Sequence, residues 1–290
     1  MRTWLLLLTY CGTRYAGWQV QPALPTVEGE IEKALQQLTG TFHKVLGSGR
    51  TDAGVHALNY PAHFQSSQNL TPREWHKALN GLLPPDIVVR NVVEKSTDFH
   101  ARHDSIGKRY AYLIHNAKER NPFAENHSWW IRQSLDVKAM RMAAECLVGR
   151  HDFSSFRARH CNGPDPVKEL REITIGKTVS PWGNLIIEFE ANSFLQHMVR
   201  IIAGTLVDVG LRKRKSISIE ELLKQRDRTQ AGQTAPSEGL YQLAVRYPTD
   251  LVSWPKELLI NPFKITENSE ECSRYFHYSS LSSTNTPTKC

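Results

Sequence analysis

The chain has 290 residues, of which 40% are hydrophobic and 22% are charged, and its formal net charge is +7. This length and composition are those of a soluble globular protein with two ordinary domains, and they exclude a chain that needs a metal or disulfides in order to fold. The five cysteines, at positions 11, 146, 161, 272 and 290, form no CxxC pair. Their spacing argues against a disulfide framework or a structural zinc site.

The excess of positive charge favours a polyanionic partner, because each phosphate neutralised by Lys or Arg releases condensed counterions. Charge alone does not distinguish a nucleic-acid-binding protein from an ordinary basic one. The apolar run over 4–8 is short and has no signal-peptide cleavage site after it, so it predicts a buried strand. No run approaches the roughly 20 apolar residues that cross a bilayer. We therefore expect no membrane association and a reducing, cytoplasmic location.

Strands and helices alternate in the first half of the chain. Thr26 is an N-cap for a helix whose apolar residues recur at helical spacing, and Gly40 stands just past its end. The segment Thr71-Pro72-Arg73-Glu74 opens a second helix, because it combines a capping box with proline at the first helical position. The elements predicted here are strands over 4–8, 62–66 and 87–93 and helices over 27–38 and 72–82.

A polar stretch rich in His and Arg, over 95–108, separates these elements from a second set. Gly149 ends the first helix of that set, and Ser218 opens its last helix with a capping box. The elements predicted here are strands over 109–115 and 240–247, two strands around the turn 181–184, and helices over 137–148, 197–209 and from 218 onward. Both halves mix strands with helices, which predicts an α+β fold with domains over 1–104 and 105–248.

The composition changes in an extension over 249–290. Its Ser/Thr-rich end, over 279–289, lacks the apolar surface needed to order itself, so we expect the end of the extension to be disordered. Trp254, Leu259 and Phe263 give its earlier part enough apolar surface to pack as a short helical appendage.

Residues 47–54 combine three glycines with one basic and one acidic side chain. In an extended chain Arg50 and Asp52 face the same side and so address one ligand, which glycine lets the backbone approach closely. A solvated surface turn with an ion pair between Arg50 and Asp52 fits the same residues. These features alone leave both interpretations open.

The string GRTDAGVHA over 49–57 resembles the signature of the TruA family of tRNA pseudouridine synthases, whose aspartate is the catalytic residue. Further segments resemble the family's motifs in the family's order, so the resemblance covers about residues 3 to 248. These segments are 10–19, 98–103, 108–112, 151–156, 192–200 and 231–236.

The resemblance implies an enzyme that isomerises uridine to pseudouridine in the anticodon arm of tRNA, near positions 38 to 40, without a cofactor. It implies that Asp52 is the catalytic residue, that Arg50 holds a flipped nucleotide and that Tyr110 stacks on the uracil. Without the resemblance, Tyr110 is an ordinary core aromatic. Arg200 lies on an otherwise apolar helix, where an unpaired charge is costly, so we expect a buried partner, for which Asp52 is the candidate.

The resemblance also implies tRNA contacts at Phe99, His100, Ala101, Arg102 and His103, although a solvated linker fits the same segment. Arg157 and Arg159 are candidate phosphate contacts, although two arginines in a loop equally fit solvated surface. The spacing of His100 and His103 does not predict a metal site, because no further ligands stand nearby in the sequence.

For the architecture, the resemblance implies mixed, mainly antiparallel sheets joined into a central sheet, with flanking helices and an active-site cleft between the two halves. It further implies a homodimer with one tRNA lying across both subunits. The alternative is a non-catalytic RNA-binding or RNA-folding protein on the same fold. Intact Arg50, Asp52, Tyr110 and Arg200 argue against that alternative.

Overall fold

The computed structural model describes residues 1–159, 161, 165–216 and 218–266. One sheet of 11 strands runs through these residues in the order β11-β8-β9-β5-β10-β3-β1-β4, with β2 on β3, β6 on β5 and β7 on β8. The strands are β1 (Arg2–Tyr10), β2 (Leu46–Gly47), β3 (His56–Ser66), β4 (Ile87–Lys95), β5 (Gly107–Asn116), β6 (Trp129–Ile131), β7 (Gly149–Asp152), β8 (Val167–Thr178), β9 (Leu185–Ala191), β10 (Leu240–Arg246) and β11 (Ile265–Thr266). Among these pairs β3 with β10 and β5 with β6 are parallel, and the others are antiparallel. The predicted α+β fold with a mixed, mainly antiparallel sheet is confirmed.

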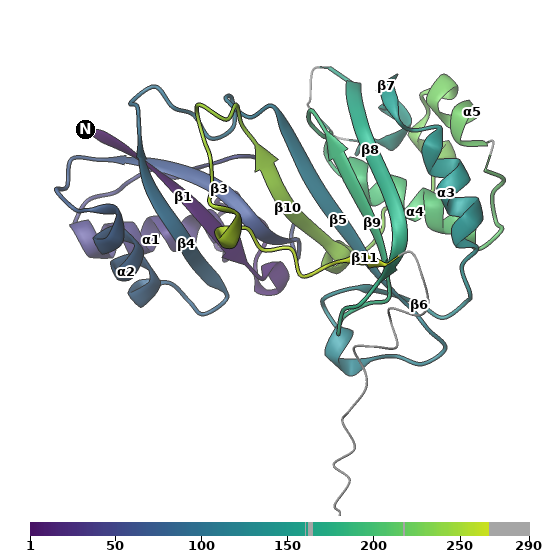
Figure 1. Cartoon of the computed structure of the whole chain (residues 1–290), viewed down its shortest axis with the longest axis horizontal. Coiled ribbons are helices and arrows are strands. Elements are labelled where there is room, and N and C mark those ends of the chain that lie inside the picture. The colour runs from purple at the N-terminus through teal and green to yellow at the C-terminus, as the bar shows by residue number, and fades with distance from the viewer. Residues whose placement is uncertain (160, 162–164, 217, 267–290) are drawn as a thin grey trace, which may run out of the picture.

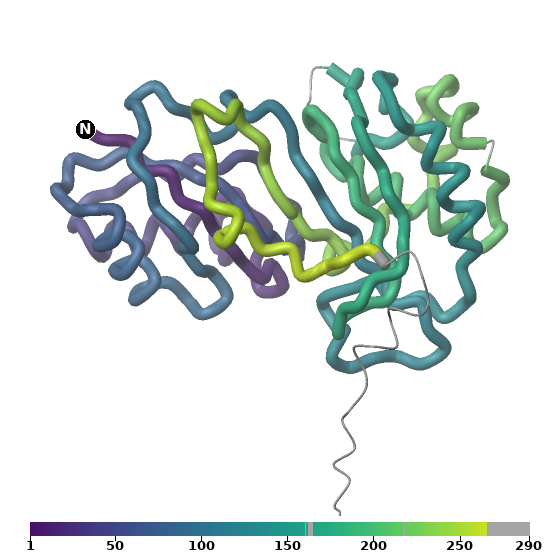
Figure 2. The backbone as a smooth tube through the Cα atoms, in the orientation of Figure 1, coloured from purple at the N-terminus to yellow at the C-terminus, as the bar shows by residue number. Residues whose placement is uncertain are grey.

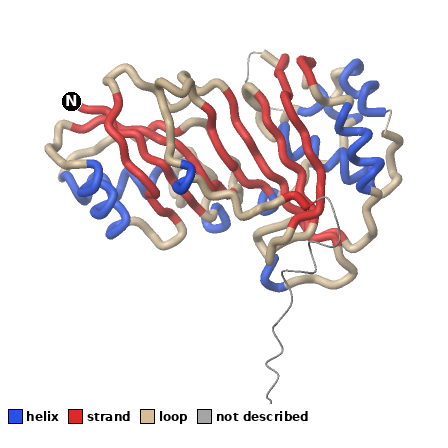
Figure 3. Tube along the Cα trace, viewed as in Figure 1, coloured by secondary structure: helices blue, strands red, loops and turns tan. Residues whose placement is uncertain are grey.

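Two groups of helices flank the sheet near its opposite ends (Figure 1, and blue in Figure 3). They are α1 (Val27–Thr39) and α2 (Pro72–Leu82) in one group, and α3 (Val137–Glu145), α4 (Met198–Gly210) and α5 (Ser218–Gln225) in the other. Both groups cover the same face of the sheet. Ala57 of β3 packs in the core of the first group, and Tyr110 of β5 packs in the core of the second. Both residues lie opposite Gln242 of β10, the strand between β3 and β5, so their side chains point to the same face. Among the described residues no helix is long and apolar enough to cross a membrane.

The first group of helices forms for the reasons that the sequence predicts. The Thr26 side chain accepts a hydrogen bond from the Gly29 amide, and Gly40 ends α1 in the left-handed conformation. Thr71 and Glu74 form the complete capping box of α2. The apolar faces of both helices pack on alternate residues of β1 and β3, which gives this half of the molecule a core of its own.

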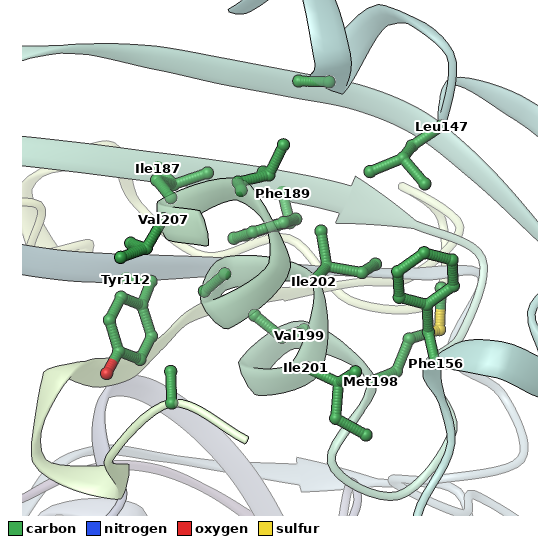
Figure 4. Close-up of a cluster of buried hydrophobic side chains, with 14 of the residues drawn as sticks. Tyr112, Leu147, Phe156, Ile187, Phe189, Met198, Val199, Ile201, Ile202 and Val207 are labelled. Carbon is green, nitrogen blue, oxygen red and sulfur yellow. The ribbon is translucent and has the colours of Figure 1, made fainter. Parts of the chain in front are cut away.

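The core of the second half surrounds α4, which is apolar on nearly all sides because it lies between the sheet and α3. Figure 4 shows Val199, Ile202 and Val207 of this helix in one cluster with Ile187 and Phe189 of β9. This packing fixes the position of α4 and therefore of the polar residues at its N-terminus. The sheet continues across the boundary predicted between residues 104 and 105, and the division into domains stays a prediction.

Two predicted elements differ from those observed by more than two residues at one end. The strand predicted over 62–66 begins at His56, because pairing with β1 overrides the strand-breaking tendency of Pro61, which lies opposite Leu7. The helix predicted over 137–148 ends at Glu145, and a tighter turn from Leu147 to the Ala144 carbonyl follows it. The short strands β2, β6, β7 and β11 were not predicted, since two to four residues carry too little periodicity.

The extension crosses the sheet face that the helices leave open, as the yellow end of the tube shows (Figure 2). Its strand β11 then pairs with β8. Over 249–266, the part of the extension that the structure describes, one short helical turn forms, Lys256–Leu258. Asn59 anchors the crossing by exchanging two hydrogen bonds with the Ile260 backbone. Phe263 is 2% exposed and packs against Trp182 and Tyr241. The segment 279–289, predicted to be disordered, lies outside the described residues.

Replacing Phe263 with alanine is expected to lower the free energy of unfolding by about 3 kcal/mol, because a buried aromatic ring leaves a cavity. Chemical denaturation measures this change. The control is Phe42→Ala, since Phe42 is 62% exposed and its loss leaves no cavity. Equal unfolding midpoints for the two variants would show that the extension adds nothing to the core.

Candidate active site

The loop over 48–55, between β2 and β3, carries Asp52 and rests on the turn that follows β1. The Tyr10 hydroxyl lies 2.9 Å from the Thr51 hydroxyl, and the Trp18 amide donates to the Thr51 carbonyl. Gly17 has a φ of +102°, and a Cβ there would lie 2.5 Å from the Thr51 carbonyl oxygen. A side chain at that position would therefore push the loop away. The turn over 10–19 thus serves as the support of the Asp52 loop.

Asp52 meets the N-terminus of α4 in the folded chain. Arg200 Nη1 donates to Asp52 Oδ2 at 2.8 Å, and His197 Nε2 lies 3.3 Å from the same oxygen. The Asp52 side chain is 27% exposed and that of Arg200 is 15% exposed. The partner expected for Arg200 is therefore the one present. The surface ion pair between Arg50 and Asp52 does not form, because Asp52 turns towards α4 instead.

A second segment holds the Arg200 guanidinium. The guanidinium Nε of Arg200 donates to the Ala235 carbonyl at 2.8 Å, and the Ala235 amide donates to the Arg200 carbonyl at 3.0 Å. The segment runs so close to α4 that a Cβ on Gly204 would overlap the Gln233 carbonyl. These contacts give the motif over 231–236 a structural role, because they hold Arg200 by its backbone carbonyl and by its guanidinium.

The electrostatic environment keeps the Asp52 carboxyl ionised. Burial raises its pKa, but the hydrogen bonds and charges of His197 and Arg200 outweigh burial and hold the pKa below its ordinary value. Nearby, burial and the negative charge of Asp52 raise the pKa of Tyr110, so its phenol stays protonated. Burial, together with the charge of Arg102, lowers the pKa of Lys108 to about 8. The site therefore presents an anionic oxygen beside neutral aromatic surface.

A cleft of about 1370 Å³ opens above Asp52 and is lined by both halves of the molecule. Tyr110 of β5 lies in it at 8% exposure, with its hydroxyl donating to Gln242 Oε1 and its ring edge-on to Phe194 at 5.1 Å. Arg50 is exposed and lines this cleft and a smaller neighbouring cavity. Asp52, Arg50, Tyr110 and Arg200 are thus brought together, as the sequence predicts.

The predicted tRNA-contacting residues separate into two sets. Phe99 and Ala101 are 3% and 0% exposed and pack with Tyr247 in the core, so their side chains hold the loop and do not face the cleft. The other members present polar groups around the cavities: Arg102 lines both, and His100 and His103 line the smaller one.

Arg157 and Arg159 flank Ala158, whose amide donates to the Gln196 carbonyl next to the cleft. Arg157 is half-buried and Arg159 is exposed. Neither lines the cleft itself. Both arginines therefore lie at its margin, within reach of a ligand that extends beyond it.

His197 and Lys108 are among the residues that line the cleft, and neither was singled out from the sequence. Lys108 Nζ donates to the Ser48 carbonyl at the start of the Asp52 loop, and Gly49 leaves room for it. Its position two residues before Tyr110 on β5 is a signal that could have identified it, because i and i+2 share a face of a strand. No comparable local signal marks His197.

One group of possible metal ligands lies apart from Asp52. Ligand atoms of Cys11, His56 and His127 are within 4.8 Å of one another. Both ring nitrogens of His56 are already engaged, Nδ1 by the Gly12 amide and Nε2 by the Asn126 carbonyl. A neutral imidazole bonded in this way has no free lone pair for a metal. His56 instead ties the β1 turn to the start of β3.

Comparisons with known proteins agree with this geometry. A family model described as tRNA pseudouridine synthase matches residues 7–104 and 143–248. A protein from Myxococcus xanthus named tRNA pseudouridine synthase A is 44% identical over 242 residues, covering 83% of this chain and 91% of that protein. Proteins of the same name from Geotalea uraniireducens and Brevibacillus brevis are 42% and 43% identical, covering 85% and 83% of this chain and 100% and 98% of theirs. The chain therefore belongs to the tRNA pseudouridine synthase family.

Proposed function

We propose that this protein is an enzyme that isomerises uridine to pseudouridine in tRNA, with Asp52 as its catalytic residue. The observation that carries the proposal is an ionised carboxylate held by Arg200 in a cleft with Tyr110 on its wall and Arg50 at its edge. The family membership supports the same reaction.

The reaction breaks the bond between N1 of uracil and C1′ of the ribose, turns the base, and joins C5 to C1′. The proton on C5 leaves and N1 gains one, so the product is an isomer of the substrate. Asp52 supplies an anionic oxygen that either attacks an electrophilic carbon or stabilises positive charge developing at C1′. The low pKa of its carboxyl keeps this oxygen charged at neutral pH.

The cleft also fits an extruded nucleotide. A stacked uridine is out of reach of a half-buried carboxylate inside a cleft, so the base must leave the helix before it reacts. Tyr110 offers the uracil an aromatic surface beside Asp52, and Arg50, which is exposed and lines the cleft, is our candidate for holding the flipped nucleotide. We assign the substrate uridines to the anticodon arm, around positions 38 to 40, on the basis of the TruA resemblance.

Purified protein mixed with an unmodified tRNA transcript tests the proposal. We expect carbodiimide labelling and primer extension to map pseudouridine to the anticodon arm. Binding of the transcript without any product would favour the non-catalytic RNA-binding alternative. Product confined to another arm would contradict the assignment of the substrate positions alone.

The polar residues beside the cleft are our candidates for tRNA contacts: His100, Arg102, His103, Arg157 and Arg159. Arg102→Ala is expected to weaken tRNA binding about three- to tenfold and to lower the slope of log K against log salt by about one, because one phosphate contact is lost. Filter binding at several KCl concentrations measures both quantities. The control is Arg73→Ala, on the exposed start of α2. An unchanged salt slope for Arg102→Ala would show that Arg102 does not contact a phosphate of the tRNA.

Three further proposals come from the sequence. A homodimer that binds one tRNA across both subunits rests on the resemblance, a cytoplasmic location rests on the cysteine spacing, and domains over 1–104 and 105–248 rest on the polar stretch over 95–108. Light scattering at micromolar concentration is expected to give the mass of two chains. The mass of one chain would contradict the dimer.

A further inference from the structure

His197 has a backbone conformation that requires an explanation. It immediately precedes α4 and has a φ of +62°, in the left-handed region. This conformation costs free energy for a residue with a Cβ, and glycine adopts it without that cost. The His197 side chain makes no capping hydrogen bond to the helix. Helix capping therefore does not explain a histidine at this position.

The imidazole points to the catalytic carboxylate instead. His197 lines the cleft, its side chain is 30% exposed, and Nε2 lies 3.3 Å from Asp52 Oδ2. Donation across this contact requires a proton on Nε2. The strained backbone angle is therefore coupled to a specific contact between this side chain and Asp52.

Two donors converge on one carboxylate oxygen. Arg200 Nη1 and His197 Nε2 both approach Oδ2, and no hydrogen bond from the described residues reaches Oδ1. One donor alone leaves the carboxylate free to rotate about its bond to Cβ, whereas two donors from different directions fix that rotation. Oδ1 is then the oxygen of Asp52 that no donor among the described residues occupies.

We infer that His197 is a positioning residue of the proposed reaction, and that it holds the Asp52 carboxylate so that Oδ1 is presented to the reacting carbon. The inference rests on the proposed function. It goes beyond that function because it distinguishes the two oxygens of Asp52 and gives a role to a residue that does not itself react.

The test distinguishes the effect of the imidazole contact from the effect of the strained backbone angle. His197→Gly removes the hydrogen bond and relieves the strain, whereas His197→Gln keeps an N–H donor at a similar distance from the backbone. With saturating tRNA we expect kcat of the glycine variant to fall about 10²-fold, as for a misplaced reacting group. We expect its KM to stay within about twofold and its unfolding midpoint to equal or exceed that of the wild type. The glutamine variant is expected to recover at least about tenfold of the lost kcat, because an amide N–H replaces the imidazole donor.

Ala23→Gly is the matched control, because Ala23 is exposed, has a φ of +59° and lies outside the cleft. It relieves the same kind of strain and is expected to leave kcat unchanged. Wild-type kcat in His197→Gly, or equal losses in the glycine and glutamine variants, would overturn the inference. If the wild-type protein itself forms no pseudouridine, the proposed function fails instead, and the two failures are thereby distinguished.

Discussion

Replacing Asp52 with asparagine is expected to lower the single-turnover rate of pseudouridine formation by about 10⁴-fold or more, the size of effect seen when a catalytic carboxylate or nucleophile is removed. Asparagine keeps the shape of the side chain, and its amide oxygen still accepts a hydrogen bond from Arg200. It has no negative charge and is a poor nucleophile, so it can neither attack C1′ nor stabilise positive charge that develops there. Rapid mixing with excess enzyme, followed by carbodiimide mapping, measures the rate.

The same variant is expected to bind tRNA within about threefold of the wild type, because Asp52 contributes no attraction to phosphate. Asp250→Asn is a suitable control, since Asp250 is exposed and does not line the cleft. A rate for Asp52→Asn within tenfold of the wild-type rate would refute the catalytic role of Asp52. The fold and the family membership would be unaffected.

Local signals were sufficient to predict most of the fold. The caps at Thr26 and Thr71 act within a few residues of the helix ends that they determine, so the sequence places those ends correctly. The beginning of β3 was missed because its pairing partners lie far away in the sequence. Leu7 lies opposite Pro61, and no pattern within a few residues of Pro61 reports that contact.

The candidate site shows the same division between local and distant contacts. Spacing alone pairs Arg50 with Asp52, but the structure pairs Asp52 with Arg200, 148 residues away. The charge of Arg200 on an apolar helix indicates that a partner exists, but no local pattern shows that the partner lies 148 residues away. His197 was missed because a left-handed backbone angle has no signature in a histidine that immediately precedes a helix.

Removal of Arg200 is expected to have the second-largest effect on the rate. Arg200→Met takes away a charged donor from Asp52 and frees the Ala235 carbonyl. We expect kcat to fall about 10³-fold, since such donors fix the geometry and charge of a site in low dielectric. The unfolding free energy should fall by about 2 kcal/mol, because a hydrogen bond to a charged group is lost and the carboxylate stays partly buried.

The loss of Arg200 is also expected to change the pH dependence of the rate, and the pKa of Asp52 determines the direction of that change. The pKa of Asp52 is held below its ordinary value, so the carboxylate, and the stability it contributes, are present above the unfolded pKa and lost as pH falls through the folded pKa. In Arg200→Met burial still raises the pKa while one of the two opposing groups is gone. The acid limb of the rate profile should therefore move to higher pH. Arg200→Lys keeps the charge but cannot hold Asp52 and Ala235 together, so it should restore the acid limb more completely than the rate. An acid limb that stays in place in Arg200→Met would show that Arg200 does not control the ionisation of Asp52.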